Sequence, residues 1–345
     1  MQAKKYQEFL ISVLTELMAV DSPTGFSKAI NEKLAEIFKK IGYESETSNK
    51  RFVKVSVKGK DSAKKIAVSA HVDTLGAMVK SIAGDGTLRF TKLGGPILPT
   101  FDGEYCRVYA DGGKVYTGTF LSNSPSCHVY KDAGTLERAE NTMHVRLDEE
   151  VSGVKDVEAL GIRTGSMIAI DTKTVVTDSG FVKSRFLDDK AGSACLITLL
   201  YALKKEGIQP DFDVDFYFTN YEEVGHGAAT IARDADELLA VDMGCVGADL
   251  ACKETQVSIC VKDGRGPYDY EIVEKLIGLA KANGINYAAD VYPYSGSDVG
   301  AAWSAGADVK GGLIGPGVHA SHGMERTHLK GLFATVELLA AYLGV

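Results

Sequence analysis

The chain of 345 residues lacks several features that would each point to a particular class of protein. No uninterrupted apolar run reaches the roughly 18 residues needed to cross a bilayer, so we expect no membrane partner. The six cysteines form no CxxC pair, which disfavours a disulfide framework and favours reduced thiols in a cytoplasmic protein. There is one tryptophan, and the 8 prolines form no proline-rich linker.

An excess of basic residues is also missing. The chain has 38 basic and 46 acidic residues, a formal net charge of −8. Nucleic-acid binding needs a basic surface that displaces phosphate counterions, so we expect no nucleic-acid partner. Hydrophobic residues make up 45% of the chain and charged residues 24%, as in a globular protein that buries a core.

Helix-like and strand-like segments alternate at both ends of the chain. Residues 10–18 and 27–41 show the spacing of amphipathic helices, and Ile66–Ala70 is an apolar run typical of a buried strand. A strongly amphipathic helix over 191–205 and further helices over 268–282 and 329–343 are expected. This alternation predicts an α/β unit made of residues 1–74 and 178–345.

The middle of the chain has a different texture. Over residues 75–177 helical periodicity disappears, glycines recur, and short β-rich pieces follow one another. Examples are 88–91, 114–120, 144–147 and 166–171. We therefore expect a small all-β domain, barrel-like in form, inserted into the α/β unit.

Residues able to bind metals or carry protons follow apolar segments or open a helix at five places, where open α/β sheets gather ligands. The places are His71 with Asp73, Asp188 with Asp189, Glu222 with Glu223, Asp242, and a segment with His319, His322 and His328. Each fragment alone has an ordinary explanation, such as a helix cap or a solvated turn.

Taken together, the five places favour a pair of divalent metal ions. Two carboxylates about 4 Å apart repel each other by about 4 kcal/mol at an effective dielectric near 20, so paired acids at a buried strand end need compensation. Two divalent ions would balance three ligand carboxylates and the free carboxylate of Glu222. Mixed imidazole and carboxylate ligands suit Zn, Co or Mn better than Ca.

The order of these motifs resembles the M42 family of metallo-aminopeptidases, some of whose members carry a cellulase or endoglucanase label. The matching residues are His71-x-Asp73, Asp188-Asp189-Lys190-x-Gly192, Glu222-Glu223, Asp242 and a C-terminal histidine. The resemblance implies a mixed-sheet, phosphorylase/hydrolase-like catalytic domain and a dimerisation domain over 75–177. It also implies a homo-oligomer, a tetrahedral dodecamer of dimers whose active sites face an interior cavity.

The resemblance further implies two divalent metal ions per subunit, with Zn preferred and Co or Mn as alternatives. One ion would be held by His71, Asp188 and Asp242, and the other by Asp188, Glu223 and His322. His322 is chosen over the other two histidines of its segment, although the spacing after it is shorter than the family's usual pattern.

The remaining two site residues would act on protons and orientation. Asp73 would orient His71, and Glu222 would be the general base that acts on a metal-bridging water. Thr74-Leu75-Gly76 and Asp189-Lys190 depart from the family's usual motifs, which leaves the substrate preference open.

The predicted function is hydrolysis of N-terminal residues from peptides with a free N-terminus. A metal-dependent deacylase would share the ions but prefer a blocked amine. A glycoside hydrolase would need two carboxyl groups about 5–9.5 Å apart and usually aromatic platforms, for which Trp303 is the only tryptophan. A non-catalytic metal-dependent scaffold would have no need of the free Glu222.

Overall fold

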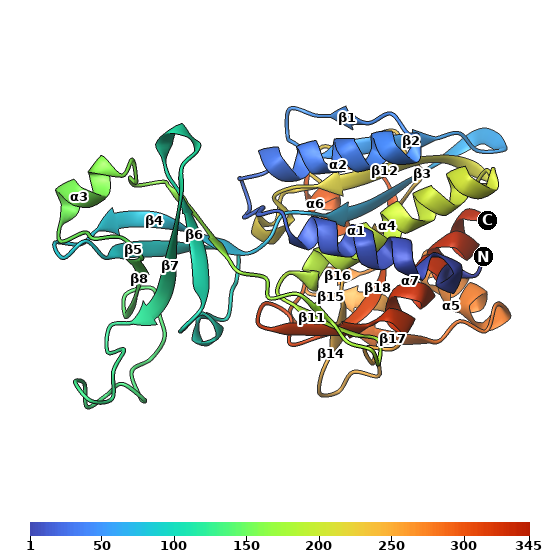
Figure 1. The fold of residues 1–345 in the computed structure, drawn as a ribbon. Helices are drawn as coiled ribbons and strands as arrows, with labels where there is room; N and C mark the ends of the chain where they lie inside the picture. Colours follow the sequence, from blue (N-terminus) through green and yellow to red (C-terminus); the bar gives the residue numbers. More distant parts are fainter.

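The fold is described from a computed structural model that covers residues 1–345. It consists of an α/β unit, on the right of Figure 1, and a small β-barrel on the left. The barrel lies between β3 and β10 of the chain, which confirms the predicted α/β fold with an inserted all-β domain. No helix has both the length and the apolar character required to span a bilayer.

The α/β unit is built on a 13-stranded mixed sheet. Its centre is a parallel run of four neighbouring strands, β12 (Phe212–Thr219), β3 (Asp61–His71), β13 (Glu237–Val241) and β18 (Lys310–His319). On one side follow β2 (Val53–Val57) and β1 (Glu46–Thr47), and on the other β19 (Glu325–His328), β11 (Phe181–Ser184) and β10 (Val175–Val176). A branch from β18 adds β14 (Gly244–Val246), β15 (Val257–Asp263), β16 (Gly266–Pro267) and β17 (Tyr287–Val291).

Helices cover this sheet, and three of them end at the residue that the sequence predicts and begin within two residues of the predicted start. They are η1 (Ala3–Tyr6), α1 (Gln7–Met18), α2 (Lys28–Ile41), α4 (Leu187–Glu206), η4 (Glu222–Val224), α5 (Tyr270–Ala282), α6 (Asp298–Ser304) and α7 (Leu329–Leu343). Every apolar residue of the predicted face of α1 is buried, and α2 ends at Gly42, whose φ of 85° stops the helix. The sequence therefore predicts these elements through burial of one apolar face.

One expectation about the helices is wrong. The sequence predicts an amphipathic helix over 191–205, but α4 is buried on all sides until its last turn. It packs against α1, α7 and β3 at the same time, so it has no polar face to present to water. An apolar helix between layers buries its small and hydroxyl side chains as well. The buried hydroxyl of Thr198 donates a hydrogen bond to the main-chain oxygen of Ala194.

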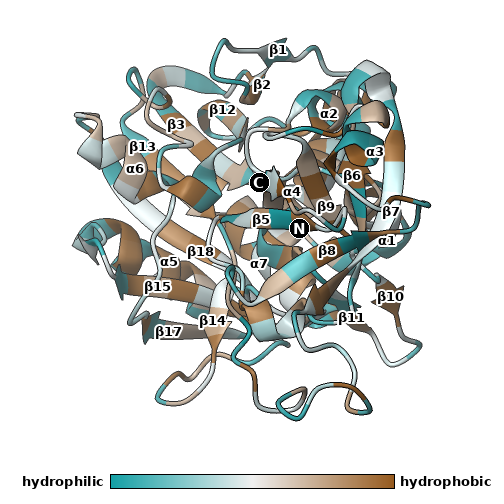
Figure 2. Cartoon of the chain, turned by 90° about the vertical axis from the view of Figure 1, so that its left-hand side faces the viewer, coloured by the Kyte–Doolittle hydropathy of each residue, from teal (hydrophilic) through white to brown (hydrophobic).

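The inserted domain is a closed antiparallel barrel. Its strands are β4 (Gly76–Ile82), β5 (Leu88–Leu93), β6 (Tyr105–Tyr109), β7 (Val115–Ser122), β8 (Met143–Leu147) and β9 (Met167–Ile170). The short elements η2 (Leu98–Thr100), η3 (Asp111–Gly113) and α3 (Val154–Ala159) lie in its connections. Hydrophobic and hydrophilic residues alternate along β5 and β8 (Figure 2), because one side of each strand faces the barrel interior.

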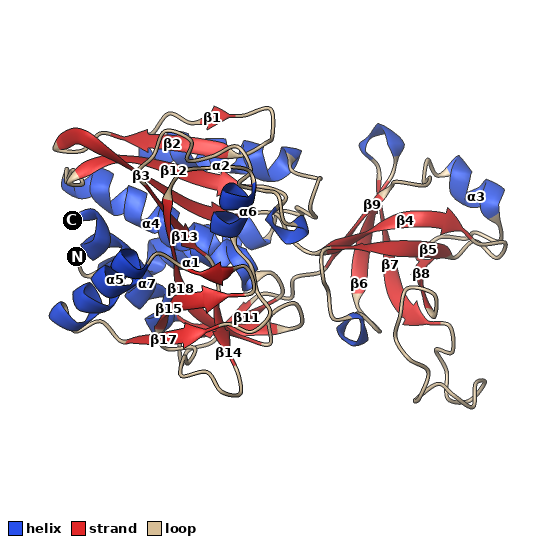
Figure 3. Ribbon diagram, turned by 180° about the vertical axis from the view of Figure 1, so that it is seen from behind, coloured by secondary structure: helices blue, strands red, loops and turns tan.

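The two regions have separate apolar cores. A cluster of 65 buried residues fills the α/β unit, and a cluster of 18 fills the barrel. Both chain termini lie at the side of the α/β unit away from the barrel (Figures 1 and 3). The chain enters the barrel directly from the end of β3, so the barrel is attached next to the edge of the sheet where β3 delivers His71.

Candidate metal centre

The ends of three neighbouring parallel strands bring the polar residues together. β12, β3 and β13 lie side by side, and Thr219 at the end of β12 pairs with His71 at the end of β3. The next residues along β12 lead into η4 with Glu222 and Glu223, and Asp242 follows the last residue of β13. Parallel strands end at one edge, so segments far apart in the sequence meet there.

Asp188 stands at the middle of this group and contacts both imidazoles. Its Oδ1 lies 3.0 Å from Nε2 of His71, and its Oδ2 lies 3.4 Å from Nε2 of His322. Nε2 of His322 is also 3.6 Å from Oε2 of Glu223, and Nε2 of His71 is 4.0 Å from Oδ1 of Asp242. One carboxylate thus presents a separate oxygen to each of two neighbouring donor sets.

The two histidines are oriented in the same manner. Nδ1 of His71 lies 2.9 Å from the main-chain oxygen of Asp73, and Nδ1 of His322 lies 2.9 Å from that of Gly95. A carbonyl oxygen only accepts, so in each ring Nδ1 carries the proton and donates it. In the neutral ring Nε2 is then the unprotonated nitrogen, available to a cation, whereas in the protonated ring Nε2 donates to a carboxylate; in both histidines it points to Asp188.

The carboxylates of the centre carry strongly perturbed pKa values. Burial, together with the charge of Asp242, raises the pKa of Glu222 well above its usual range, and burial with the charge of Asp188 does the same for Glu223. Burial and the charge of Asp188 raise the pKa of Asp242 to about 7. Burial alone would raise the pKa of Asp188, but hydrogen bonds from protonated His322 and His71 outweigh burial and lower it.

These observations test whether the residues suit divalent cations. The ligand atoms of His71, Asp188 and Glu223 lie within 4.8 Å of one another, and so do those of His71, Asp189 and Asp242. Oε1 of Glu223 is buried without a hydrogen-bond partner. Buried carboxylates that repel each other and leave an oxygen unpartnered are compensated by positive charge, so the donor set fits metal ions.

The structure separates the three C-terminal histidines. His322 lies in the centre. His328 lies where α7 begins, and both of its ring nitrogens make hydrogen bonds there. Its Nε2 is 3.0 Å from the main-chain oxygen of Ser179, and its Nδ1 accepts from the N–H of Lys330 at 3.0 Å. His319 is exposed at the end of β18. Asp73 is fully buried, and its carboxylate accepts weak hydrogen bonds from the N–H groups of residues 222 and 223.

Two buried acids next to the centre were not assigned to it from the sequence. Asp189 accepts from the N–H groups of His71 at 3.3 Å and Gly192 at 3.1 Å. Glu325 accepts from the N–H of Asp188 at 3.1 Å through one oxygen and from that of His322 at 2.9 Å through the other. The available signal in the sequence was an acid three residues after His322, at the first position of β19.

The approach of Asp189 to α4 explains a glycine of the motif. A Cβ atom on Gly192 would lie 2.4 Å from Oδ1 of Asp189 and 2.6 Å from the main-chain oxygen of Val241. No side chain fits at such distances. Residue 192 must be glycine for the acidic pair to sit over the first turn of α4.

The segment between β5 and η2 of the inserted domain holds His322 from two sides. Gly95 accepts from the ring, and the N–H of Ile97 donates to the main-chain oxygen of His322 at 3.1 Å. Arg185 is buried at the same junction and donates to the carbonyl oxygens of Thr100 at 2.5 Å and Gly323 at 3.3 Å. The inserted domain therefore contributes to the position of His322.

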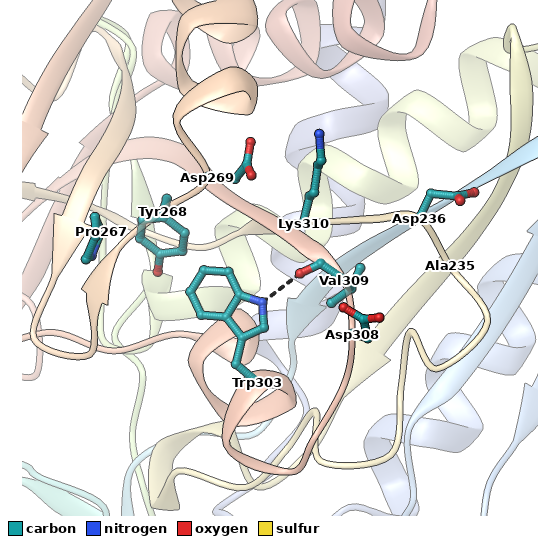
Figure 4. A pocket seen from close by; sticks show the side chains of 9 residues that line it. All are labelled: Ala235, Asp236, Pro267, Tyr268, Asp269, Trp303, Asp308, Val309 and Lys310. Carbon is teal, nitrogen blue, oxygen red and sulfur yellow. Dashed lines mark hydrogen bonds between the residues drawn. The ribbon is translucent and has the colours of Figure 1, made fainter.

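A cavity of about 910 Å³ opens over the centre and includes Asp188, Glu222, Glu223, Asp242 and His322 in its wall. A cavity of about 400 Å³ lies at the opposite ends of β13 and β18 (Figure 4). Two of its three acids accept hydrogen bonds from the backbone: Asp269 caps α5, and Asp236 accepts from the N–H of Lys65. Of these two cavities, only the larger combines an imidazole with several carboxylates.

Comparison with known proteins shows the family. A family model described as M42 glutamyl aminopeptidase matches residues 53–338. A curated relative, "Putative aminopeptidase YhfE" of Bacillus subtilis (strain 168), is 42% identical over 334 residues, 96% of each chain. The chain belongs to the M42 family of aminopeptidases, which confirms the resemblance seen in its motifs and makes it a peptide-bond hydrolase.

Solved structures share the fold. A TET aminopeptidase from the marine sediment archaeon Thaumarchaeota archaeon SCGC AB-539-E09 superposes with a TM-score of 0.88 at 21% identity, over 97% of this chain and 96% of its own. The TET1 peptidase of Pyrococcus horikoshii superposes with a TM-score of 0.85 at 22% identity, over 97% and 99%. The fold is thus that of TET peptidases, and neither the deacylase nor the glycoside hydrolase alternative gains support.

Proposed function

We propose that this aminopeptidase uses two divalent metal ions, with Zn preferred over Co and Mn, and that Glu222 is its general base. The observation that carries the proposal is the position of Asp188, which presents one oxygen to His71 and the other to His322. Asp242 lies beside the first histidine and Glu223 beside the second. Each ion would then have one imidazole, one carboxylate of its own and a shared carboxylate.

Bound metal ions supply Lewis acidity, which polarises the scissile carbonyl and lowers the pKa of water. Glu222 makes no side-chain hydrogen bond, and its Oε2 lies 3.9 Å from Nε2 of His71 in the cavity wall. This free carboxylate would take a proton from the attacking water and return it to the leaving amine. Asp73 would hold the backbone of η4, and with it Glu222, through its hydrogen bonds to that segment.

The same centre favours a substrate with a free N-terminus. The nitrogen of a free α-amino group could bind at the metal–carboxylate centre, whereas the nitrogen of an acylated amine is a poor ligand. Peptides with a free N-terminus are therefore the proposed substrates, and cleavage would start at the chain end. A preference for N-acetylated substrates would instead favour the deacylase.

The test is a panel of aminoacyl p-nitroanilides, offered free and N-acetylated to protein loaded with Zn, Co or Mn in turn. We expect turnover of free substrates only, loss of activity with a chelator, and recovery when metal is returned. Activity that survives complete metal removal would overturn the metal-dependent mechanism. A stoichiometry of one ion per subunit at full activity would overturn the two-ion centre.

We also propose that residues 75–177 are the dimerisation domain of a homo-oligomer in the cytoplasm. The TET1 peptidase of Pyrococcus horikoshii can assemble into a tetrahedron or a large octahedral shell, and a tetrahedral dodecamer is the state proposed here. All six cysteines are unpaired, which suits a reducing compartment. The native mass from light scattering tests the assembly, and a monomeric mass with full activity would overturn it.

A further inference from the structure

Arg185 buries a positive charge where the α/β unit meets the barrel. It directly follows β11 and is 1% exposed, and Cζ of its guanidinium lies 5.5 Å from the ring centroid of Phe101. Oε1 of Glu104 is 3.6 Å from the guanidinium, which is longer than a hydrogen bond. Because burying a charge costs stability unless the charge is well hydrogen-bonded, the groups to which Arg185 donates explain its position.

The guanidinium donates to two segments that belong to different regions. In the connection between β5 and β6 of the barrel, Nη2 donates to the main-chain oxygen of Thr100 at 2.5 Å, and Nη1 donates to its Oγ1 at 3.2 Å. Nη1 also donates to the main-chain oxygen of Gly323 at 3.3 Å. Gly323 directly follows His322, so Arg185 ties the barrel connection to the turn that carries this histidine.

The turn requires such support because its backbone is unfavourable. The φ angles of His322 and Ala320 are 63° and 59°, in the left-handed region that costs a residue with a side chain about 1–2 kcal/mol. A turn of this kind keeps its shape only where neighbouring groups hold it. The barrel connection supplies the N–H of Ile97, which donates to the His322 oxygen at 3.1 Å, and Arg185 holds the next carbonyl, that of Gly323.

The connection and the turn are also in close contact. A Cβ atom on Gly323 would lie 3.4 Å from Cγ2 of Thr100 and 3.9 Å from Cδ1 of Ile97, and a Cβ atom on Gly95 would lie 3.4 Å from Nδ1 of His322. Residues 95–100 therefore lie along the whole turn. A displacement of this connection would move the imidazole with it.

We propose that Arg185 is a positioning residue for His322: it clamps the 95–100 connection to the turn and so keeps the imidazole facing Asp188. The inference rests on the proposed function, in which Asp188, Glu223 and His322 hold the second ion. The planar guanidinium serves two carbonyl oxygens from fixed directions, which a single ammonium group does less well.

The effect should be confined to one of the two proposed ions. The other ion would be held by His71, which stands at the end of β3. Its ring bonds to the main-chain oxygen of Asp73 and to Asp188, both within the α/β unit. Loss of Arg185 should therefore weaken the ion at His322 and spare the ion at His71.

A second arginine at the junction provides a matched control. The guanidinium of Arg107, in β6 of the barrel, donates to the carboxylate of Asp21 in the α/β unit at 2.5 and 2.7 Å. Arg107→Met thus removes a contact between the two regions without touching the turn at His322. It separates a general loss of contact between the regions from a specific loss of support for the histidine.

The first measurement uses metal-free protein and follows hydrogen exchange at the N–H of Ile97, which the oxygen of His322 accepts. Arg185→Met keeps the apolar stem but removes the donors, so exchange should become about tenfold faster. Arg185→Lys keeps the buried charge and can still donate to one carbonyl, so it should give a smaller change in the same direction. Arg107→Met should leave this exchange as it is in the wild type.

The second measurement is calorimetric titration of the same four proteins with zinc. The wild type should bind two ions, and in Arg185→Met the affinity for one of them should fall by about 10–100-fold while the other affinity is retained. Arg185→Lys should lie between the two and provides the same comparison if the methionine variant does not fold. Arg107→Met should retain both affinities.

Three results would overturn the proposal. Exchange at Ile97 could be the same in wild type and both Arg185 variants, Arg107→Met could accelerate it equally, or both ions could be weakened to the same extent. A wild type that binds a single ion would contradict the proposed function instead. Because hydrogen exchange is measured without metal, it would still decide whether Arg185 supports the turn.

Discussion

The α/β unit and the barrel bury different kinds of polar side chain. The α/β unit buries histidine, lysine, arginine and many acids, including His71, Asp73, Asp189 and Glu325. In the barrel, the buried polar residues are hydroxyls only: Thr119, Ser122, Ser124 and Ser166. Because burying a charge costs far more than burying a hydroxyl, the α/β unit gives up stability that a bound cation restores, whereas the barrel is held by its apolar cluster.

The sharpest way to test this contrast is to remove the proposed base. Glu222→Gln keeps the shape of the side chain but cannot take a proton, so we expect kcat to fall by about 10²–10⁴-fold. Metal content, measured by atomic absorption, should stay unchanged because Glu222 is not a proposed ligand. Glu271→Gln alters an exposed acid on α5 and should leave kcat unchanged. An unaltered kcat in Glu222→Gln would remove Glu222 from the base role.

A core substitution in the barrel should affect stability without affecting chemistry. Phe120 is fully buried and contacts the rings of Phe90 and Phe101, with centroids 5.0 and 5.2 Å away. We expect Phe120→Ala to reduce the free energy of unfolding of the barrel by about 3–5 kcal/mol. Urea unfolding followed by tyrosine signals should show the loss, and Val129→Ala, at an exposed position, should not.

The lone tryptophan makes this test selective. Trp303 belongs to the α/β unit, where its indole donates to the Val309 oxygen at 2.8 Å. Its fluorescence should report a smaller shift in Phe120→Ala than the tyrosines of the barrel do. Equal shifts in both signals would show that the two regions unfold as one unit and would break the comparison.

Glu325 provides a smaller effect on activity. The carboxylate accepts from the N–H groups of Asp188 and His322, and in Glu325→Gln one of these donors would face an amide N–H₂. We expect kcat/KM or metal affinity to fall by about 10–100-fold. Arg326→Ala changes the exposed neighbour on the same strand and serves as the control. If Glu325→Gln matched the control, the two hydrogen bonds would have no role in the centre.

The smallest expected effect is a pH dependence in the barrel. Burial lowers the pKa of His144. The charge of Asp85 opposes this shift, and the smaller contribution of Arg146 adds to it. The unfolded chain therefore binds a proton near the ordinary value of 6.5 that the folded chain does not bind. Stability of the barrel should decrease as pH falls through about 6.5 and then level off.

His144→Asn should remove this decrease, as measured by urea midpoints between pH 5 and 8. The asparagine cannot titrate and can still bond to Asn123, whose side-chain oxygen lies 3.0 Å from Nδ1 of the histidine. A decrease of the same size in the variant would assign the pH dependence to other groups.

The elements that the sequence predicts well are those with one apolar face or one apolar run. α7 occupies the predicted residues 329–343, and β3 extends to the predicted His71. α4 was predicted as amphipathic because spacing along one helix does not reveal that α1, α7 and β3 cover it from several sides. Burial on all sides is a property of the packed layers.

The candidate site divides in the same manner. Acids after apolar strands, such as Glu223 and Asp242, can be found from the sequence because parallel strands end at one edge. The roles of Asp189 and Glu325 could not be found in this way, since both accept main-chain N–H groups of residues that only the folded chain brings near.

The 95–97 segment of the inserted domain makes two hydrogen bonds to His322, one to its ring and one to its main-chain oxygen, so the insertion is part of the metal centre's support. Exchanging this domain for one from a relative would alter an imidazole that faces Asp188, even if every residue of the α/β unit were retained. A replacement domain would therefore have to keep this segment unchanged if the position of His322 beside Asp188 is to be retained.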